Sequence, residues 1–166
     1  MLRLLLSFFL SISGLIFNNI IFEKIKLDGV RPDFFLISVV SIAVLRNDIE
    51  SALFGFLCGL IRDIFFGHIL GFFAICYMLI GYLCGLPFKY FYRENYFVPM
   101  ILCFFASIGF ETIIFIFISR DFIFSALKII LYESVYNTVF IFVIYPILYF
   151  FNKKLEIYEI RHNSFF

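Results

Sequence analysis

The sequence contains little charge, and this scarcity excludes most soluble folds. Of its 166 residues, 15% are charged and 64% are hydrophobic, and the mean hydropathy is +1.07. Soluble domains contain about 25% charged and about 45–50% apolar residues, so a soluble chain of this composition would expose large, aggregating apolar patches. The charges also balance, with 13 Lys and Arg against 12 Asp and Glu, which leaves no basic surface for nucleic acid. We therefore predict an integral membrane protein that contacts the lipid bilayer and binds no nucleic acid.

Residues that perform catalysis or hold metals are also scarce. Tryptophan is absent, and the only histidines are His68 and His162. The cysteines form no Cys-x-x-Cys pair; they are Cys58, Cys76, Cys84 and Cys103. This pattern favours buried free thiols and leaves no donor set for zinc. No nucleophile elbow, zinc-protease motif, phosphate-binding loop or dinucleotide fingerprint is present. We expect no catalytic residue, no metal and no cofactor, and hence no enzyme.

What the sequence has in abundance is apolar runs separated by short charged stretches. A helix needs about 20 apolar residues to cross the hydrocarbon core. The runs predict an all-α polytopic membrane protein with about six transmembrane helices in one compact bundle. These helices are expected at residues 4–22, 34–45, 49–66, 69–88, 97–119 and 129–151. They form a transmembrane domain over residues 1–151, followed by a polar C-terminal tail at 152–166.

Three details of this topology follow from length and charge. The run at 34–45 makes only about 18 Å of helix, so either its flanks extend it or it forms a re-entrant hairpin with the next run, giving four spans and a hairpin. The first run is too long for a signal peptide and is expected to be retained, while residues 122–128 are expected to lie at the interface. Lys153 and Lys154 beside the last run favour cytoplasmic termini.

Small residues recur every four positions within the apolar runs. Such spacing places them on one helix face, where two backbones can approach closely. We expect the runs at 49–66 and 69–88 to pack through these faces, with docking of a partner helix as the alternative. The helix-packing or partner-docking positions are Ser51, Gly55, Gly59, Asp63, Gly67, Gly71, Gly81 and Gly85.

Three polar residues lie inside the last two runs, where lipid makes them costly. Glu111 lies in the fifth run, and Glu133 and Asn137 share a face of the sixth. Ionisable groups in a bilayer face protein or water, so we expect a polar clamp that fixes the packing of these two helices. The alternative is a proton or ion relay. Arg62 and Asp63 are adjacent and point about 100° apart on a helix, which favours a membrane-boundary pair over a mutual salt bridge.

An ordered set of residues resembles the MreD family of rod shape-determining proteins over nearly the whole chain. The matching positions are Pro32, Asp33, Gly55, Phe56, Gly59, Leu60, Asp63, Leu70, Gly71, Gly81, Tyr82, Leu83 and Gly85. Asn137 and the Tyr145-Pro146 step also resemble the last span of that family. From this set we take Pro32, Asp33, Phe56, Leu60 and Tyr82 as the family-motif site residues.

The resemblance implies a non-catalytic scaffold of the cell-elongation complex, which makes peptidoglycan and determines rod shape, in the bacterial inner membrane. It implies an MreC-like membrane protein as partner and, indirectly, an MreB-like filament, a RodA-like glycosyltransferase and a penicillin-binding protein. It also implies a fold similar to the substrate-binding subunits of energy-coupling-factor vitamin transporters. The alternative function is therefore a small membrane transporter or vitamin-binding subunit of that type, for which the sequence offers few polar residues.

Overall fold

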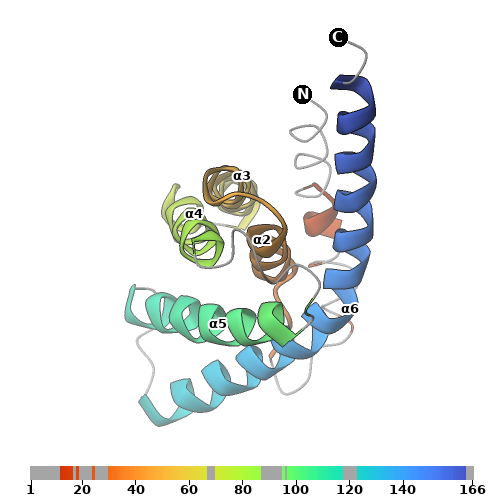
Figure 1. Cartoon of the computed structure of the whole chain (residues 1–166). Helices are drawn as coiled ribbons and strands as arrows, with labels where there is room; N and C mark the ends of the chain where they lie inside the picture. Colours follow the sequence, from red (N-terminus) through yellow and green to blue (C-terminus); the bar gives the residue numbers. More distant parts are fainter. Residues whose placement is uncertain are drawn as a thin grey trace.

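The computed structural model of the chain is a bundle of helices (Figure 1). It describes residues 12–16, 18, 24, 30–66, 70–86, 95, 97–117 and 123–163. Within these ranges the helices are α2 (Phe34–Leu45), α3 (Asp48–Phe66), α4 (Phe72–Gly85), α5 (Phe97–Phe117) and α6 (Ile123–Asn163). A shorter helical stretch covers residues 12–16. The residues that the structure describes contain no β-strand. The predicted all-helical class is confirmed.

The observed helices follow the apolar runs closely except at the C-terminal end. α2 has the predicted bounds, and α3 and α5 differ from theirs by one or two residues, whereas α4 is shorter at both ends. The first predicted span, 4–22, lies mostly outside the described residues. α6 differs most, because it includes residues 123–128 of the stretch expected at the interface, 122–128, and most of the expected tail. No glycine or proline follows Pro146, so no residue interrupts the helix before Asn163.

The short helix α2 occupies the centre of the bundle. All twelve of its residues are buried, and it packs against α3, α4, α5 and α6. Figure 1 shows it between the α3–α4 pair and α6. A helix of about 18 Å is shorter than the roughly 30 Å hydrocarbon core. Because protein surrounds α2 on every side, its unpaired terminal backbone groups can be satisfied by neighbouring helices instead of water.

One face of helix α5 contacts the other helices. Its buried residues are Pro99, Cys103, Ser107 and Phe110, which recur every three or four positions. The rest of the helix carries large exposed apolar side chains, with Phe97 72% and Phe105 66% exposed. A single narrow buried stripe on an otherwise apolar helix is the arrangement expected where lipid, not water, covers the other faces.

Helix α6 repeats this arrangement with a more polar inner stripe. Its buried residues are Ser134, Asn137, Ile141, Tyr145, Leu148, Asn152 and Leu155. The exposed positions between Ser134 and Asn152 are apolar, including Val139, Phe142 and Phe150. Figure 1 shows that the helix bends along its length, and Pro146, which cannot donate a backbone hydrogen bond, lies inside it.

Two of the described helices are long and apolar enough to cross a membrane. They are α5, over Phe97–Phe117, and the Leu127–Leu155 part of α6. α2 and α4 are also apolar but shorter. The four cysteines are buried free thiols, as predicted.

Glycines allow α3 and α4 to approach each other at the backbone. A Cβ on Gly55 would lie 2.2 Å from the Tyr77 carbonyl oxygen, and one on Gly59 would lie 2.3 Å from a Cα atom of α4. From the opposite side, a Cβ on Gly81 would lie 2.4 Å from the Ser51 carbonyl oxygen. Real Cβ atoms do not come this close to backbone, so any side chain at these positions would push the helices apart. This is the most extensive pairwise contact among the described helices.

The remaining glycines of the predicted set do not all lie on the α3–α4 packing face. Gly85 lies close to Asp48, where an added Cβ would be 2.8 Å from the Asp48 Cα. Gly71 does not lie on a packing face, because nothing lies within 4 Å of where its Cβ would be. It precedes α4 with φ of 94°, a left-handed conformation that glycine adopts without strain. Gly67 lies outside the described residues.

The α3–α4 contact predicts a sharp difference between two Gly→Ala substitutions. Gly59→Ala should destabilise the protein by at least about 1–3 kcal/mol, because the new methyl group meets backbone that cannot rotate away. Gly109→Ala in α5 is the matched control, because nothing lies within 4 Å of its added Cβ. Thermal unfolding in detergent micelles measures both. Equal melting temperatures for the two variants would contradict the close approach.

Candidate functional site

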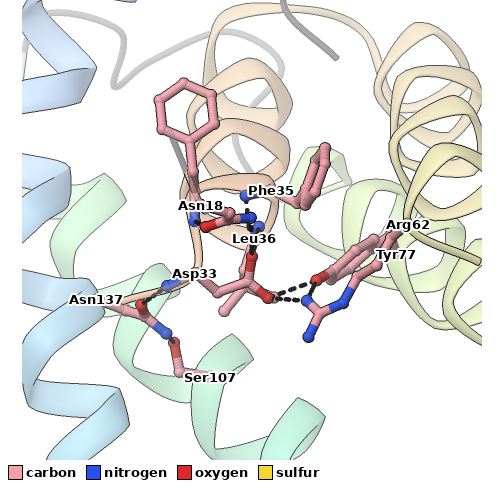
Figure 2. Close-up of polar contacts among 9 residues, drawn as sticks. Asn18, Asp33, Phe35, Leu36, Arg62, Tyr77, Ser107 and Asn137 are labelled. Carbon is pink, nitrogen blue, oxygen red and sulfur yellow. Dashed lines mark hydrogen bonds and ion pairs between the residues drawn. The ribbon is translucent and has the colours of Figure 1, made fainter. Parts of the chain in front are cut away.

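Asp33 begins α2 and is the centre of the candidate site. An aspartate immediately before an apolar run is a strong helix N-cap. Its Oδ1 atom accepts hydrogen bonds from the backbone N–H groups of Phe35, at 3.0 Å, and Leu36, at 3.5 Å. Its backbone is extended, as an N-cap residue requires. Figure 2 shows the carboxylate directed into the space between α2, α3 and α4.

The second oxygen of this carboxylate joins α2 to two other helices. Oδ2 accepts a hydrogen bond from the Tyr77 hydroxyl of α4 at 2.5 Å and forms an ion pair with Nη1 of Arg62 from α3. Arg62 also donates to the Tyr77 hydroxyl. The Asp33 and Arg62 side chains are 12% and 19% exposed. A charge this far from water is costly unless it is paired, so each group here requires the other.

Aromatic rings surround the Arg62 guanidinium. Its central carbon lies 4.4 Å from the centre of the Phe73 ring and 5.5 Å from the Tyr77 and Phe110 rings. The Tyr77 and Phe110 rings themselves stack at 4.9 Å. The negative faces of aromatic rings attract a cation, and this attraction strengthens where water is excluded. The rings and Asp33 therefore both hold Arg62 in position.

Two asparagines attach the remaining helices to the same point. The Asp33 backbone N–H donates to Oδ1 of Asn137 in α6 at 2.7 Å, and Asn137 donates through Nδ2 to the Ser107 hydroxyl of α5 at 3.0 Å. Asn18 accepts from the Phe34 N–H at 2.9 Å and donates to Asp33 Oδ1 at 3.4 Å. Residues from α2, α3, α4, α5 and α6 thus meet in one polar network, together with Asn18 (Figure 2).

A cavity of about 150 Å³ lies beside this network and is partly open to the surface. Its lining residues are Asn18, Arg31, Pro32, Asp33, Phe35, Arg62, Phe66, Phe73, Glu111 and Glu133. A water molecule takes about 30 Å³ of liquid volume, so this space suits a few waters. It is smaller than the roughly 300–1,000 Å³ of pockets that enclose drug-sized ligands.

The three polar residues predicted inside the last two runs occupy two different environments. Asn137 belongs to the Asp33 network. Glu111 of α5 and Glu133 of α6 are half-buried and line the cavity. Asn137 also bonds Ser107, so it joins α6 to α5 as well as to α2.

Asp63 has a role separate from that of its neighbour Arg62. Its carboxylate accepts hydrogen bonds from the backbone N–H groups of Gly71, Phe73 and Ala74 at 3.0, 3.1 and 3.0 Å. The four N–H groups at a helix start have no partner within the helix, so a side chain of α3 caps the start of α4. Arg62 and Asp63 are therefore held by different helices and not by each other.

A smaller polar cluster lies at the opposite end of α2. Arg46 follows the last residue of α2, is buried, and donates through Nε to Oδ1 of Asn152 in α6 at 3.0 Å. The Ser51 hydroxyl lies close to the carbonyl oxygens of Asn47, at 2.8 Å, and Ile42, at 3.3 Å. Both ends of the central helix are thus satisfied by side chains of the surrounding helices.

The family-motif positions divide into inner and outer residues. Pro32 and Asp33 border the cavity, and Pro32 is buried. Phe56 and Tyr82 lie on the outer surface of α3 and α4, at 37% and 41% exposure, and Leu60 is half-buried. They therefore do not form one site with Asp33.

The sequence interpretation missed Asn18 and Tyr77 and did not foresee that Arg62 pairs with Asp33. One available signal was the arginine itself, because a cation in an apolar helix requires a nearby partner. The distance of 29 residues between Arg62 and Asp33 gave no indication of which carboxylate that partner would be. Among the described residues, no group of three or more His, Cys, Asp or Glu side chains is placed to hold a metal ion.

Comparison with known proteins identifies a family. The family model described as rod shape-determining protein MreD matches residues 1–155. No curated protein and no solved structure matches the chain significantly.

The ion pair predicts non-additive stability losses. Arg62→Ala should lower the free energy of unfolding by roughly 3–5 kcal/mol, because it leaves Asp33 charged and unpaired away from water. Asp33→Asn should also destabilise, and the double variant should lose less than the two single losses together, since neither charge then remains unpaired. Unfolding measured in bicelles tests this. Additive losses would contradict a direct interaction.

The cap of α4 predicts a graded response at Asp63. Asp63→Ala should cost about 1–3 kcal/mol, because three backbone N–H groups lose their acceptor. Asp63→Asn is the conservative control, since its amide oxygen still accepts and asparagine is a good N-cap residue. The melting temperature should fall in the order wild type, Asn, Ala. An Ala variant as stable as the wild type would contradict the cap.

Proposed function

The chain belongs to the MreD family of rod shape-determining proteins, and from this premise we propose that it is a non-catalytic membrane scaffold of the bacterial cell-elongation complex. The family match carries the proposal, because it covers residues 1–155 and thus α2 to α5 and most of α6. Membership itself implies a membrane protein with a role in determining rod shape. The proposal adds that this role is to hold other components together while they synthesise peptidoglycan.

The use of the polar residues supports a scaffold. Asp33, Arg62 and Asn137 are engaged in contacts between helices, and Asp63 caps a neighbouring helix. The scaffold binds an MreC-like membrane protein directly. Through it, the scaffold connects to an MreB-like filament on one side of the membrane and to a RodA-like glycosyltransferase and a penicillin-binding protein.

The proposed topology has six spans, with both termini in the cytoplasm and the bundle in the inner membrane. The two long apolar helices and the two shorter ones support a multi-pass arrangement. The burial of α2 by four helices explains how a span of only twelve residues is tolerated. The predicted likeness to the substrate-binding subunits of energy-coupling-factor transporters belongs to the same proposal.

The cavity bears on the alternative of a vitamin-binding subunit. Such a subunit needs a pocket with polar and aromatic walls, and the cavity has both. Its volume of about 150 Å³ is, however, less than that of pockets for vitamin-sized molecules. The volume therefore favours the scaffold.

Depletion and rescue in the rod-shaped host test the scaffold. Depleted cells should become round, expression of the chain should restore rods, and an MreC-like protein should co-purify with it from solubilised membranes. Gly109→Ala is the control for substitution itself, because it contacts nothing, and should behave as wild type. Depleted cells that keep their shape, or a folded protein that retains no MreC-like partner, would contradict the proposal. Thermal stabilisation by a vitamin would favour the alternative.

A further inference from the structure

The antiparallel α5–α6 pair has two polar contacts one helical turn apart. Ser107 and Asn137 form the first, with a hydrogen bond of 3.0 Å. Glu111 lies four residues after Ser107, and Glu133 lies four residues before Asn137. In an antiparallel pair this spacing moves both side chains one turn in the same direction, so the two carboxyl groups face each other. Both side chains line the same cavity.

The chemistry of these two contacts differs. The amide of Asn137 carries its own donor and bonds a hydroxyl, so the first contact is independent of pH. An ionised carboxylate has no donor, so two carboxyl groups can hydrogen-bond only if at least one of them is protonated. Two carboxylates that face each other in a half-buried place would repel each other strongly.

The neighbouring charges leave this acid pair only partly compensated. From α3, Arg62 faces the cavity but is paired with Asp33 at the start of α2. Arg31, which precedes α2, lines the same cavity and attracts Glu133. The other titratable group facing the pair among the described residues is the Tyr77 hydroxyl of α4, which is bonded to Asp33.

We propose that Glu111 and Glu133 share a single proton across the α5–α6 contact, and that release of this proton at higher pH separates the two helices at this turn. With the proton, the pair is a carboxyl hydrogen-bonded to a carboxylate. Without it, two negative charges face each other, and α5 and α6 move apart around the Ser107–Asn137 contact. The partly open cavity, which both glutamates line, supplies the water that takes the proton. The contact is therefore present at lower pH and lost as pH rises through the titration of the pair.

Infrared spectroscopy of the wild-type protein in liposomes tests the shared proton directly. A protonated carboxyl has a carbonyl band distinct from that of a carboxylate, and it shifts in D₂O. We expect one such band that disappears reversibly as pH is raised. Absence of a titrating carboxylic-acid band in folded wild-type protein would overturn the proposal without any variant.

Isosteric substitutions distinguish a shared proton from two separate ones. Glu111→Gln and Glu133→Gln should each abolish the band completely, because in either variant the new amide donates to the remaining carboxylate. Glu50→Gln is the control, since Glu50 is also a half-buried glutamate of a helix but does not line the cavity, and the band should persist. Loss of half the band in each single variant, or loss in only one, would overturn the shared proton.

The separation of the helices requires a second measurement. Spin labels on the exposed positions Ile116 of α5 and Leu127 of α6 report the distance between the helices near the acid pair. This distance should increase with pH in the wild type, with the same midpoint as the infrared band, and should not change with pH in Glu111→Gln. A pH-independent distance in the wild type would overturn the conformational half of the proposal. These measurements need no partner protein, so they remain valid even if the proposed scaffold function is wrong.

Discussion

The burial of the Asp33 carboxylate is the constraint on which the rest of the structure depends. A charge at the start of a helix inside a membrane bundle must find donors in protein, since lipid offers none. It receives them from its own helix, from Arg62 of α3 and from Tyr77 of α4. The N–H of the same residue reaches Asn137, which in turn reaches Ser107. The position of each helix is therefore set relative to a single residue, and a shift of any of them would leave a polar group without a partner.

This constraint explains the unusual central helix. α2 is too short to reach both membrane surfaces, and all of its residues are buried. Its start is satisfied by the Asp33 network and its end by the region of Arg46 and Asn152. The helices around it carry polar and small residues on their inner stripes among large buried ones such as Phe54 and Tyr145, and their outer faces are also largely apolar. Glycines let the backbones of α3 and α4 pack closely. The resulting van der Waals contacts would be lost if bulky side chains held these helices apart.

The two ends of α2 differ in a way that matters for a scaffold. At the end near Arg46, this arginine donates to Asn152 of α6, and the Ser51 hydroxyl of α3 lies close to the Ile42 carbonyl oxygen. The end at Asp33 borders a cavity with several ionisable groups, including Glu111 of α5 and Glu133 of α6. A non-catalytic protein must act through its shape and its contacts. The proposed shared proton makes that shape depend on pH, while the remaining polar contacts stay fixed.

The sequence by itself determined the class of protein, the bounds of α2, α3 and α5, and the membership of a family. Composition and run length are local properties, and the solvent in which a helix is stable follows from them. The glycine spacing also indicated where backbones could meet. Only the tertiary structure decided that Arg62 pairs with Asp33, that Asp63 caps α4, and that Asn137 and Glu133, four residues apart, serve different contacts. Pairing between residues 29 or 104 positions apart depends on how whole helices pack, and no local pattern encodes which donor will reach which acceptor.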